Sequence, residues 1–160
     1  MNIIPITQHN RNQVSEFFQA SWGSAEMVIS SGVYDCSTLD GFIVLNADKN
    51  IIGLITYVKR GKEIEIISLD SIEEGKGIGS LLIKSLEEVA SQGRMEKITV
   101  ITTNDNLHAL RFYQKRGYFL SKILVHAVNK ARQLKPEIPL IGNDGIPIRD
   151  EIVLEKKFIY

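Results

Sequence analysis

The sequence predicts a mixed α/β fold in which an antiparallel meander of strands feeds a βαβ unit. Apolar segments at residues 41–46, 51–58 and 63–69 are separated by the turn signals Ala-Asp-Lys-Asn and Arg-Gly-Lys, a pattern typical of antiparallel strands. Residues 77–92 are amphipathic with helical periodicity. The β-branched segment 97–103 follows directly, and strand, helix and strand in this order form a right-handed crossover between parallel strands.

The N-terminal part of the chain is expected to be helical. Residues 7–20 open with Thr7 as a candidate cap and carry Val14, Phe17 and Phe18 at helical spacing. A second, short helix is expected over residues 24–30. Both precede the first strand of the meander.

The helix at residues 77–92 has one apolar face and one charged face. Its apolar face consists of Ile78, Leu81, Leu82, Leu86 and Val89. Lys84, Glu87 and Glu88 lie mostly opposite, and Gly93 supplies the stop. After the strand at 97–103, we expect a helix at 106–116, a strand at 118–128, a long loop at 133–148 and a last strand at 150–158.

Composition limits the class of protein. The 160 residues predict a single domain over residues 1–160, long enough to bury about 70% of its extended-chain surface. Lysine plus arginine and aspartate plus glutamate both number 19, and no basic stripe is present, so we expect no nucleic-acid partner. No apolar run approaches about 18 residues and no secretion signal opens the chain, so we expect a cytoplasmic protein without a membrane partner.

The cysteine and histidine content argues against three further classes. The single cysteine, Cys36, excludes an internal disulfide framework and suits a reducing compartment. No Cys/His cluster has metal-ligand spacing, so we expect no metal site. The three histidines are scattered without a matching triad, which argues against a Ser-His-Asp hydrolase.

Three alternate glycines, Gly75, Gly77 and Gly79, lie between the third strand and the helix at 77–92. Glycine allows unusual backbone angles and close approach to a ligand, and a helix N-terminus attracts anions. The spacing G-x-G-x-G fits neither the dinucleotide pattern G-x-G-x-x-G nor the triphosphatase pattern G-x-x-x-x-G-K-[ST]. The segment is therefore either a phosphate-binding loop of another kind or a glycine-rich connection without a ligand.

Two segments carry a family resemblance. Residues 74–79, Glu-Gly-Lys-Gly-Ile-Gly, resemble the [QR]-x-x-G-x-[GA] pyrophosphate loop of the GNAT N-acetyltransferase superfamily, although Glu74 replaces the usual Gln or Arg. Residues 106–118, Asn-Leu-His-Ala-Leu-Arg-Phe-Tyr-Gln-Lys-Arg-Gly-Tyr, resemble the superfamily pattern N-x-x-A-x-x-F-Y-x-K-x-G-[FY] at every defined position. The resemblance covers roughly residues 41–118.

The resemblance implies a GNAT-type fold whose central parallel strands splay apart, with acetyl-CoA as co-substrate and no metal. It implies that pantetheine lies along the backbone of Leu69, Asp70 and Ser71, and that Asn104 or Asn106 contacts the CoA arm. The residues implied to form the pyrophosphate loop are Glu74, Gly75, Lys76, Gly77, Ile78, Gly79 and Ser80. A carboxylate at position 74 would repel pyrophosphate, so we expect its side chain to turn to solvent.

The resemblance also implies an acyltransferase that moves acetyl from acetyl-CoA to a primary amine by direct attack. Tyr113 matches the family tyrosine that faces the sulfur, and its phenol, with an ordinary pKa near 10, is protonated at neutral pH. Glu63 falls where some family members carry a glutamate base. Glu65, two residues further on the same face of the strand, or a water molecule, are the open alternatives.

A different class remains open: a non-catalytic acyl-CoA sensor or interaction module on the same fold. The amine acceptor is also open, between a protein N-terminus, a lysine, a polyamine, an aminoglycoside and an amino acid. The long, apolar late loop is expected to cover the acceptor side, to contact a second subunit in a homodimer, or to dock on its own domain.

Overall fold

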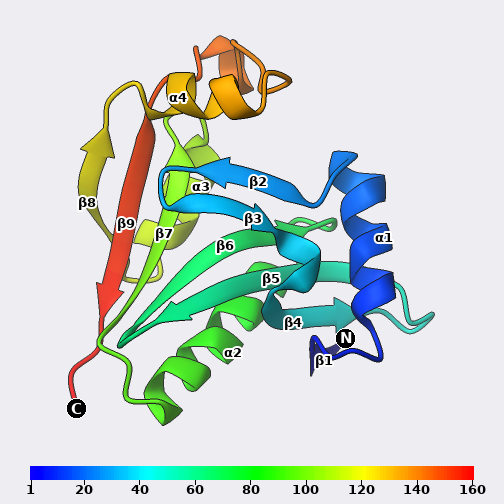
Figure 1. The fold of residues 1–160 in the computed structure, drawn as a ribbon. Coiled ribbons are helices and arrows are strands. Elements are labelled where there is room, and N and C mark those ends of the chain that lie inside the picture. The colour runs from blue at the N-terminus through cyan, green and yellow to red at the C-terminus, as the bar shows by residue number, and fades with distance from the viewer. The chain divides into compact units, whose positions relative to one another are not determined.

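The computed structural model describes residues 1–160, and its helices and strands are labelled in Figure 1. The chain forms two compact units. Unit 1 comprises Met1–Met27, Tyr34–Ile98 and Phe158–Tyr160, and unit 2 comprises Val28–Val33 and Thr99–Lys157. No helix combines the length and the apolar character needed to cross a membrane.

Unit 1 is built on an antiparallel sheet with the strand order β1-β4-β5-β6 (Figure 1). The strands are β1 (Asn2–Pro5), β4 (Asp40–Leu45), β5 (Ile51–Arg60) and β6 (Glu63–Ser71). The unit also holds the helices α1 (Arg11–Trp22) and α2 (Ile78–Gln92) and the short 3-10 turn η1 (Cys36–Thr38). The predicted antiparallel meander is confirmed, and β1 is an additional strand at its edge.

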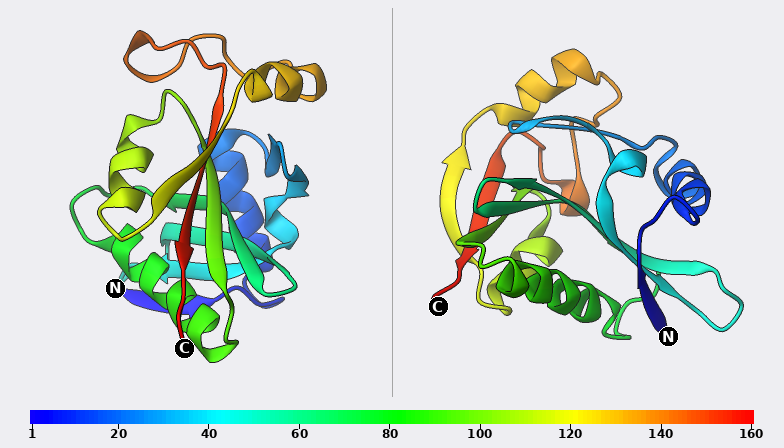
Figure 2. Two further views of the ribbon diagram at one scale, coloured as in Figure 1. Left: turned by 90° about the vertical axis from the view of Figure 1, so that its left-hand side faces the viewer. Right: turned by 60° about the horizontal axis from the view of Figure 1, so that its bottom comes forward.

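Helices α1 and α2 cover opposite faces of this sheet (Figure 2). Helix α2 contacts β4, β5 and β6 and buries Ile78, Leu82, Ile83, Leu86 and Ala90. Helix α1 contacts β5 and η1 and buries Val14 and Phe18. Burial of these apolar stripes is the main favourable term that holds both helices on the sheet.

Gly53 of β5 determines how closely α2 approaches the sheet. A Cβ atom at this position would lie 2.3 Å from Ile78 Cγ2 and 3.3 Å from Leu82 Cδ1. Gly53 is also the cross-strand partner of Ser71, the last residue of β6. One small residue therefore adjoins both the end of β6 and the first residue of α2.

A β-bulge interrupts the pairing of β6 with β5. The partners of Ser68 and Ile66 are adjacent residues on β5, so Ile67 is the extra residue. Because an extra residue reverses the alternation of side chains beyond it, Glu65 faces the same side of the sheet as Ser68 and Asp70.

Unit 2 contains three strands in the order β7-β9-β8, with β8 antiparallel to β9. These are β7 (Lys97–Thr103), β8 (Phe119–Leu124) and β9 (Glu151–Lys157), and the first two residues of β7 belong to unit 1. The unit also contains α3 (Leu107–Gln114), α4 (Ala127–Leu134) and the turn η2 (Asn143–Gly145). The mixed α/β class is confirmed, and the strand at 97–103 has its predicted bounds.

The expected short helix at residues 24–30 is wrong. The segment forms strand β2 (Glu26–Ile29), which pairs with β3 (Gly32–Asp35) in a two-stranded sheet. The tip of this hairpin belongs to unit 2, where the Ser30 N–H donates to Glu151 Oε1 at 3.1 Å. Glu151 is only 1% exposed, so a distant buried acceptor stabilises an extended conformation that the β-branched Val28 and Ile29 already favour.

The strand predicted at residues 118–128 is too long. Strand β8 ends at Leu124, and α4 begins directly after His126. His126 has a left-handed φ of 63°, and its N–H donates to Asp150 Oδ1 at 2.9 Å. This turn converts the predicted end of the strand, and the first two residues of the predicted loop, into helix α4.

The remaining late loop is held on unit 2 by side chains of that unit. The Arg132 guanidinium donates to the carbonyls of Ile138 at 3.1 Å, Pro139 at 2.7 Å and Ile148 at 2.6 Å. Asp105 Oδ2 accepts the Asn143 N–H at 3.0 Å. Of the three roles expected for this loop, these bonds agree with docking on its own domain.

The packing at Gly53 gives a stability prediction. Replacing Gly53 by Ala forces the start of α2 away from β5, and overpacking of this kind costs about 1–3 kcal/mol. Thermal unfolding should show a lower Tm for Gly53→Ala. Gly93→Ala is the control, because its Cβ would meet only ordinary contacts from 3.4 Å and its φ is not left-handed; equal Tm values for the two variants would contradict the packing argument.

Candidate functional site

The glycine loop connects β6 to α2 and is exposed from Ile72 to Gly77. Gly75 and Gly77 both have a φ of 75°, in the left-handed region that other residues adopt only with strain. No atom lies within 4 Å of a Cβ built at either position, so these glycines are required by backbone conformation and not by crowding. The space beside the loop is therefore open.

Gly77 is also the N-cap of α2 and offers no side-chain cap to the first turn. Most N-caps are Ser, Thr, Asp or Asn, whose side chains bond the first-turn N–H groups. The Leu81 N–H bonds the Gly77 carbonyl at 3.0 Å, so the helix is regular from its start. A 15-residue helix thus presents its N-terminal turn beside an open loop, which is the arrangement that binds phosphate groups.

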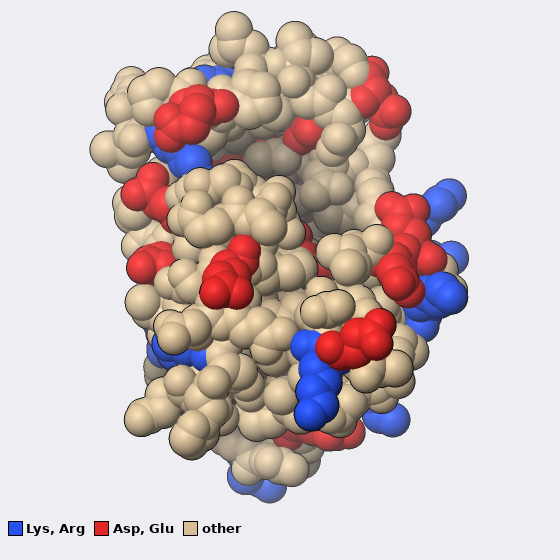
Figure 3. Space-filling view, turned by 90° about the vertical axis from the view of Figure 1, so that its right-hand side faces the viewer, with Lys and Arg blue, Asp and Glu red and all other residues tan.

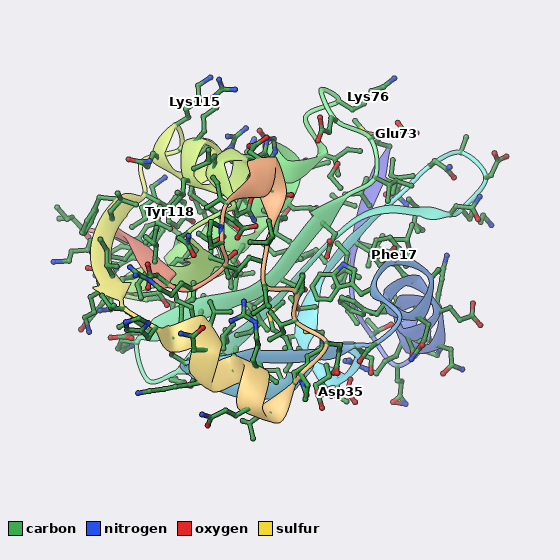
Figure 4. All side chains as sticks on the ribbon, turned by 90° about the horizontal axis from the view of Figure 1, so that it is seen from above. Phe17, Asp35, Glu73, Lys76, Lys115 and Tyr118 are labelled. Carbon is green, nitrogen blue, oxygen red and sulfur yellow. The ribbon has the colours of Figure 1, made fainter.

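The charged side chains of the loop lie in solvent. Glu73, Glu74 and Lys76 are exposed, and Figure 4 shows Lys76 extending outward from the tip of the loop. The expected solvent orientation of Glu74 agrees with its exposure. We therefore expect backbone N–H groups, and not the Lys76 cation, to be the main anion-binding groups of the loop.

Leu69, Asp70 and Ser71 form the end of β6, where they pair with Ile55, Leu54 and Gly53 of β5. Ser71 is exposed and its hydroxyl donates to the Glu73 carbonyl at 3.1 Å. The segment predicted to contact pantetheine is therefore a regular strand that runs directly into the glycine loop.

A row of polar groups lies on the α1 face of β5 and β6, beneath α1 and η1. The hydroxyls of Thr56 and Ser68 are 2.5 Å apart and fully buried, and both bond the thiol of Cys36. Burial raises the pKa of the Cys36 thiol to about 11. The thiol is therefore neutral at pH 7 and is a poor nucleophile.

The two glutamates considered as bases differ in environment. Glu65 is buried, and its Oε1 accepts from Arg60 Nη1 at 2.6 Å, while Arg60 Nη2 donates to the Tyr34 hydroxyl. The hydrogen bond that Arg60 donates to Glu65 raises the pKa of the Arg60 guanidinium. Glu63 is half exposed at the start of β6 and lies 3.4 Å from Lys97 Nζ. The role of Glu63 as a base stays a prediction.

Asp70 has a feature that sequence reasoning missed. Its backbone was predicted to contact pantetheine, whereas its side chain accepts a hydrogen bond from Trp22 Nε1 at 3.1 Å. Burial raises the pKa of the Asp70 carboxyl to about 6, and the bond from Trp22 partly offsets this rise. Nothing in the local sequence indicates this contact, because the two residues are 48 positions apart.

The other predicted site residues belong to unit 2. Asn106 is the N-cap of α3, and its side chain accepts from the Ala109 N–H at 3.1 Å. Tyr113, on the same helix, is 4% exposed and makes edge contacts with the rings of Phe112 and Tyr118 at 5.2 and 5.5 Å.

The Asn104 side chain forms hydrogen bonds with backbone groups of unit 2. Its Oδ1 accepts the N–H groups of Arg149 and Asp150, both at 3.0 Å, and its Nδ2 donates to the Pro147 carbonyl at 2.9 Å. These bonds join the end of β7 to the segment that precedes β9. Of the two asparagines predicted to contact the CoA arm, Asn104 thus uses both ends of its side-chain amide to bond the protein's own backbone.

Lys and Arg are interspersed with Asp and Glu on the face shown in Figure 3. The structure contains no group of three or more His, Cys, Asp or Glu side chains placed to share a metal ion.

Comparison with known proteins agrees with this arrangement. Residues 8–118 match the family model of the acetyltransferase (GNAT) family. Two uncharacterized proteins of Bacillus subtilis (strain 168) are similar over almost their whole length. YxbD is 55% identical over 157 residues, 98% of this chain and 99% of YxbD, and YdhI is 50% identical over 156 residues, 98% of both chains.

Solved structures share the fold. A Bacillus subtilis acetyltransferase in complex with CoA matches with a TM-score of 0.70 and 18% identity over 99% of both chains. A GNAT family acetyltransferase from Elizabethkingia anophelis with acetyl-CoA bound matches with a TM-score of 0.68 and 18% identity, over 98% of this chain and 97% of that one. The family model matches residues 8–118, and the shared fold agrees with it: the chain belongs to the acetyltransferase (GNAT) family.

Proposed function

We propose that this protein is an N-acetyltransferase that transfers the acetyl group of acetyl-CoA to a primary amine. The observation that carries the proposal is the open glycine loop at the uncapped N-terminus of α2, with left-handed Gly75 and Gly77. Similar proteins were solved with CoA or acetyl-CoA bound, which supports the same co-substrate here.

In this proposal the loop binds the pyrophosphate through its main chain. The backbone from Gly75 to Ser80 supplies N–H donors, and the positive end of α2 adds favourable charge. The backbone of Leu69, Asp70 and Ser71 binds pantetheine. Of the two asparagines, we favour Asn106 for the contact with the CoA arm, because Asn104 makes three bonds to the backbone and Asn106 makes one.

The proposed reaction is a direct transfer. The amine nitrogen attacks the thioester carbonyl carbon, the C–S bond breaks, and the departing thiolate takes a proton from Tyr113 to become the free CoA thiol. Holding both substrates in line removes the need for a covalent nucleophile. Glu63, Glu65 or a water molecule receives the proton released by the amine.

The test combines binding with turnover. Calorimetry should detect acetyl-CoA binding, and free CoA thiol should be released in the presence of one class within a panel of amines. The panel comprises N-terminal peptides, lysine peptides, polyamines, aminoglycosides and amino acids. Binding without thiol release from any amine would favour a non-catalytic acyl-CoA module, and absence of binding would contradict both functions.

Gly79→Ala tests the loop. Gly79 is the second residue of α2, where Ala has the higher helix propensity, so the variant should keep or raise the Tm. Its methyl group lies beside the proposed pyrophosphate and should weaken acetyl-CoA binding at least about tenfold, or about 1.4 kcal/mol. Gly93→Ala, at the other end of the same helix, should leave the affinity unchanged. A folded Gly79→Ala variant with parental affinity would refute the proposed loop contact.

Tyr113→Phe tests the proton donor. The substitution keeps the ring and its edge contacts, so acetyl-CoA should still bind, while kcat should fall by about 10²–10⁴ because general acid catalysis is lost. Tyr118→Phe is the matched control, since Tyr118 is equally buried and packs on Tyr113. If both variants retain the parental kcat, Tyr113 is not the acid.

A further inference from the structure

The Asp70 carboxylate has one oxygen that the protein does not satisfy. Trp22 Nε1 donates to Oδ1, whereas Oδ2 is buried and has no hydrogen-bond partner. Buried polar atoms are almost always paired, because an unpaired acceptor costs about 1–3 kcal/mol and a charged one costs more. An orphaned carboxylate oxygen at this place therefore requires an explanation.

The groups around Asp70 on the α1 face do not neutralise it. The hydroxyls of Thr56 and Ser68 on the same face bond each other and the Cys36 thiol. The other titratable groups of this face are acidic or already paired. Asp35 lies beside η1, and Glu65 forms an ion pair with Arg60. Burial and the Trp22 bond account for the shifted pKa of Asp70, with no contribution from a lysine or arginine.

Trp22 is the hydrogen-bond partner of this carboxylate and is itself partly exposed. It is the last residue of α1 and is 37% exposed, and its ring makes an edge contact with the buried Phe18 at 5.3 Å. The indole is thus fixed on one side by Phe18 and on the other by a single hydrogen bond. A ligand that donates to Oδ2 can therefore bind Asp70 while Trp22 keeps its bond to Oδ1.

We propose that the Asp70 side chain receives the amino group of the acceptor, with its Oδ2 accepting an ammonium N–H and Trp22 holding its Oδ1. This inference rests on the proposed N-acetyltransferase function and assigns its acceptor class: an amine that is cationic when free, bound on the α1 face of β6. Asp70 lies between Leu69 and Ser71, so its backbone faces the proposed pantetheine path while its side chain faces the amine.

The proton balance follows from this placement. Asp70, in place of Glu63, Glu65 or a water molecule, takes one proton from the ammonium. The neutral amine then attacks the thioester carbon, and the C–S bond breaks. The amide nitrogen then loses a second proton to Tyr113, and this proton replaces the one that Tyr113 gives to the thiolate. Asp70 returns its own proton to solvent. A carboxyl with a pKa of about 6 is a stronger base than an ordinary aspartate, which favours the first step.

The single tryptophan of the chain allows a test that does not require turnover. Trp22 emission should titrate with a midpoint of about 6 in the parent and in Asp48→Asn, an exposed control, and should lose this transition in Asp70→Asn. Ethylammonium chloride should lower the midpoint, because the cation stabilises the carboxylate, whereas sodium chloride at equal ionic strength and ethanol should not. A midpoint unaffected by ethylammonium, or a transition that persists in Asp70→Asn, would overturn the inference.

Turnover then separates this inference from the proposed function. With the amine that is acetylated fastest in the panel, Asp70→Asn should lower kcat/KM for the amine by about 10²–10⁴, remove the acidic limb near pH 6 and leave acetyl-CoA affinity unchanged. An active parent with an equally active Asp70→Asn variant would refute the role of Asp70 alone. A parent that acetylates no amine would refute the proposed function, while the fluorescence titration would still decide whether Asp70 binds an ammonium ion.

Discussion

The close contact between Gly53 and Ile78 is the constraint on which the rest of unit 1 depends. Gly53 pairs with the last residue of β6, and its missing side chain leaves room for the first residue of α2. The loop that joins β6 to α2 therefore begins and ends beside the same residue of β5, Gly53. It must reverse direction over a few residues, which explains the left-handed angles at Gly75 and Gly77. Sheet packing thereby determines where the helix N-terminus points.

The bulge at Ile67 has a comparable effect on the other face. Strict alternation would place Glu65 on the α2 face, among the apolar side chains of that helix. The extra residue moves it to the α1 face, where Arg60 and Tyr34 satisfy it. All the polar side chains of β6 that are buried or partly buried, from Glu65 to Asp70, consequently share one face. This segregation keeps β6 apolar on the α2 face from Ile64 to Leu69 and places polar groups among the apolar side chains of the α1 face.

Much of this arrangement could be predicted from the sequence, because it depends on local patterns. The β-branched segment 97–103, the apolar stripe of α2 and the alternate glycines each carry their own signal, and the structure has these elements within a residue or two of their predicted bounds. The predictions are wrong where the local conformation depends on residues that are distant in the sequence. Residues 24–30 are extended because of a hairpin partner and Glu151, and the strand after Tyr118 stops because Asp150 stabilises a left-handed His126. The task of Asn104 and the orphaned oxygen of Asp70 likewise depend on partners more than forty residues away, which no local pattern encodes.

The central claim is that backbone groups between β6 and α2 bind the pyrophosphate of acetyl-CoA. The most direct measurement compares the affinities of acetyl-CoA and S-acetylpantetheine, which lacks the pyrophosphate, by calorimetry at two salt concentrations. We predict that acetyl-CoA binds at least about tenfold more tightly, that inorganic pyrophosphate competes with it, and that added salt narrows the difference. Equal affinities for the two thioesters, without competition by pyrophosphate, would contradict the account.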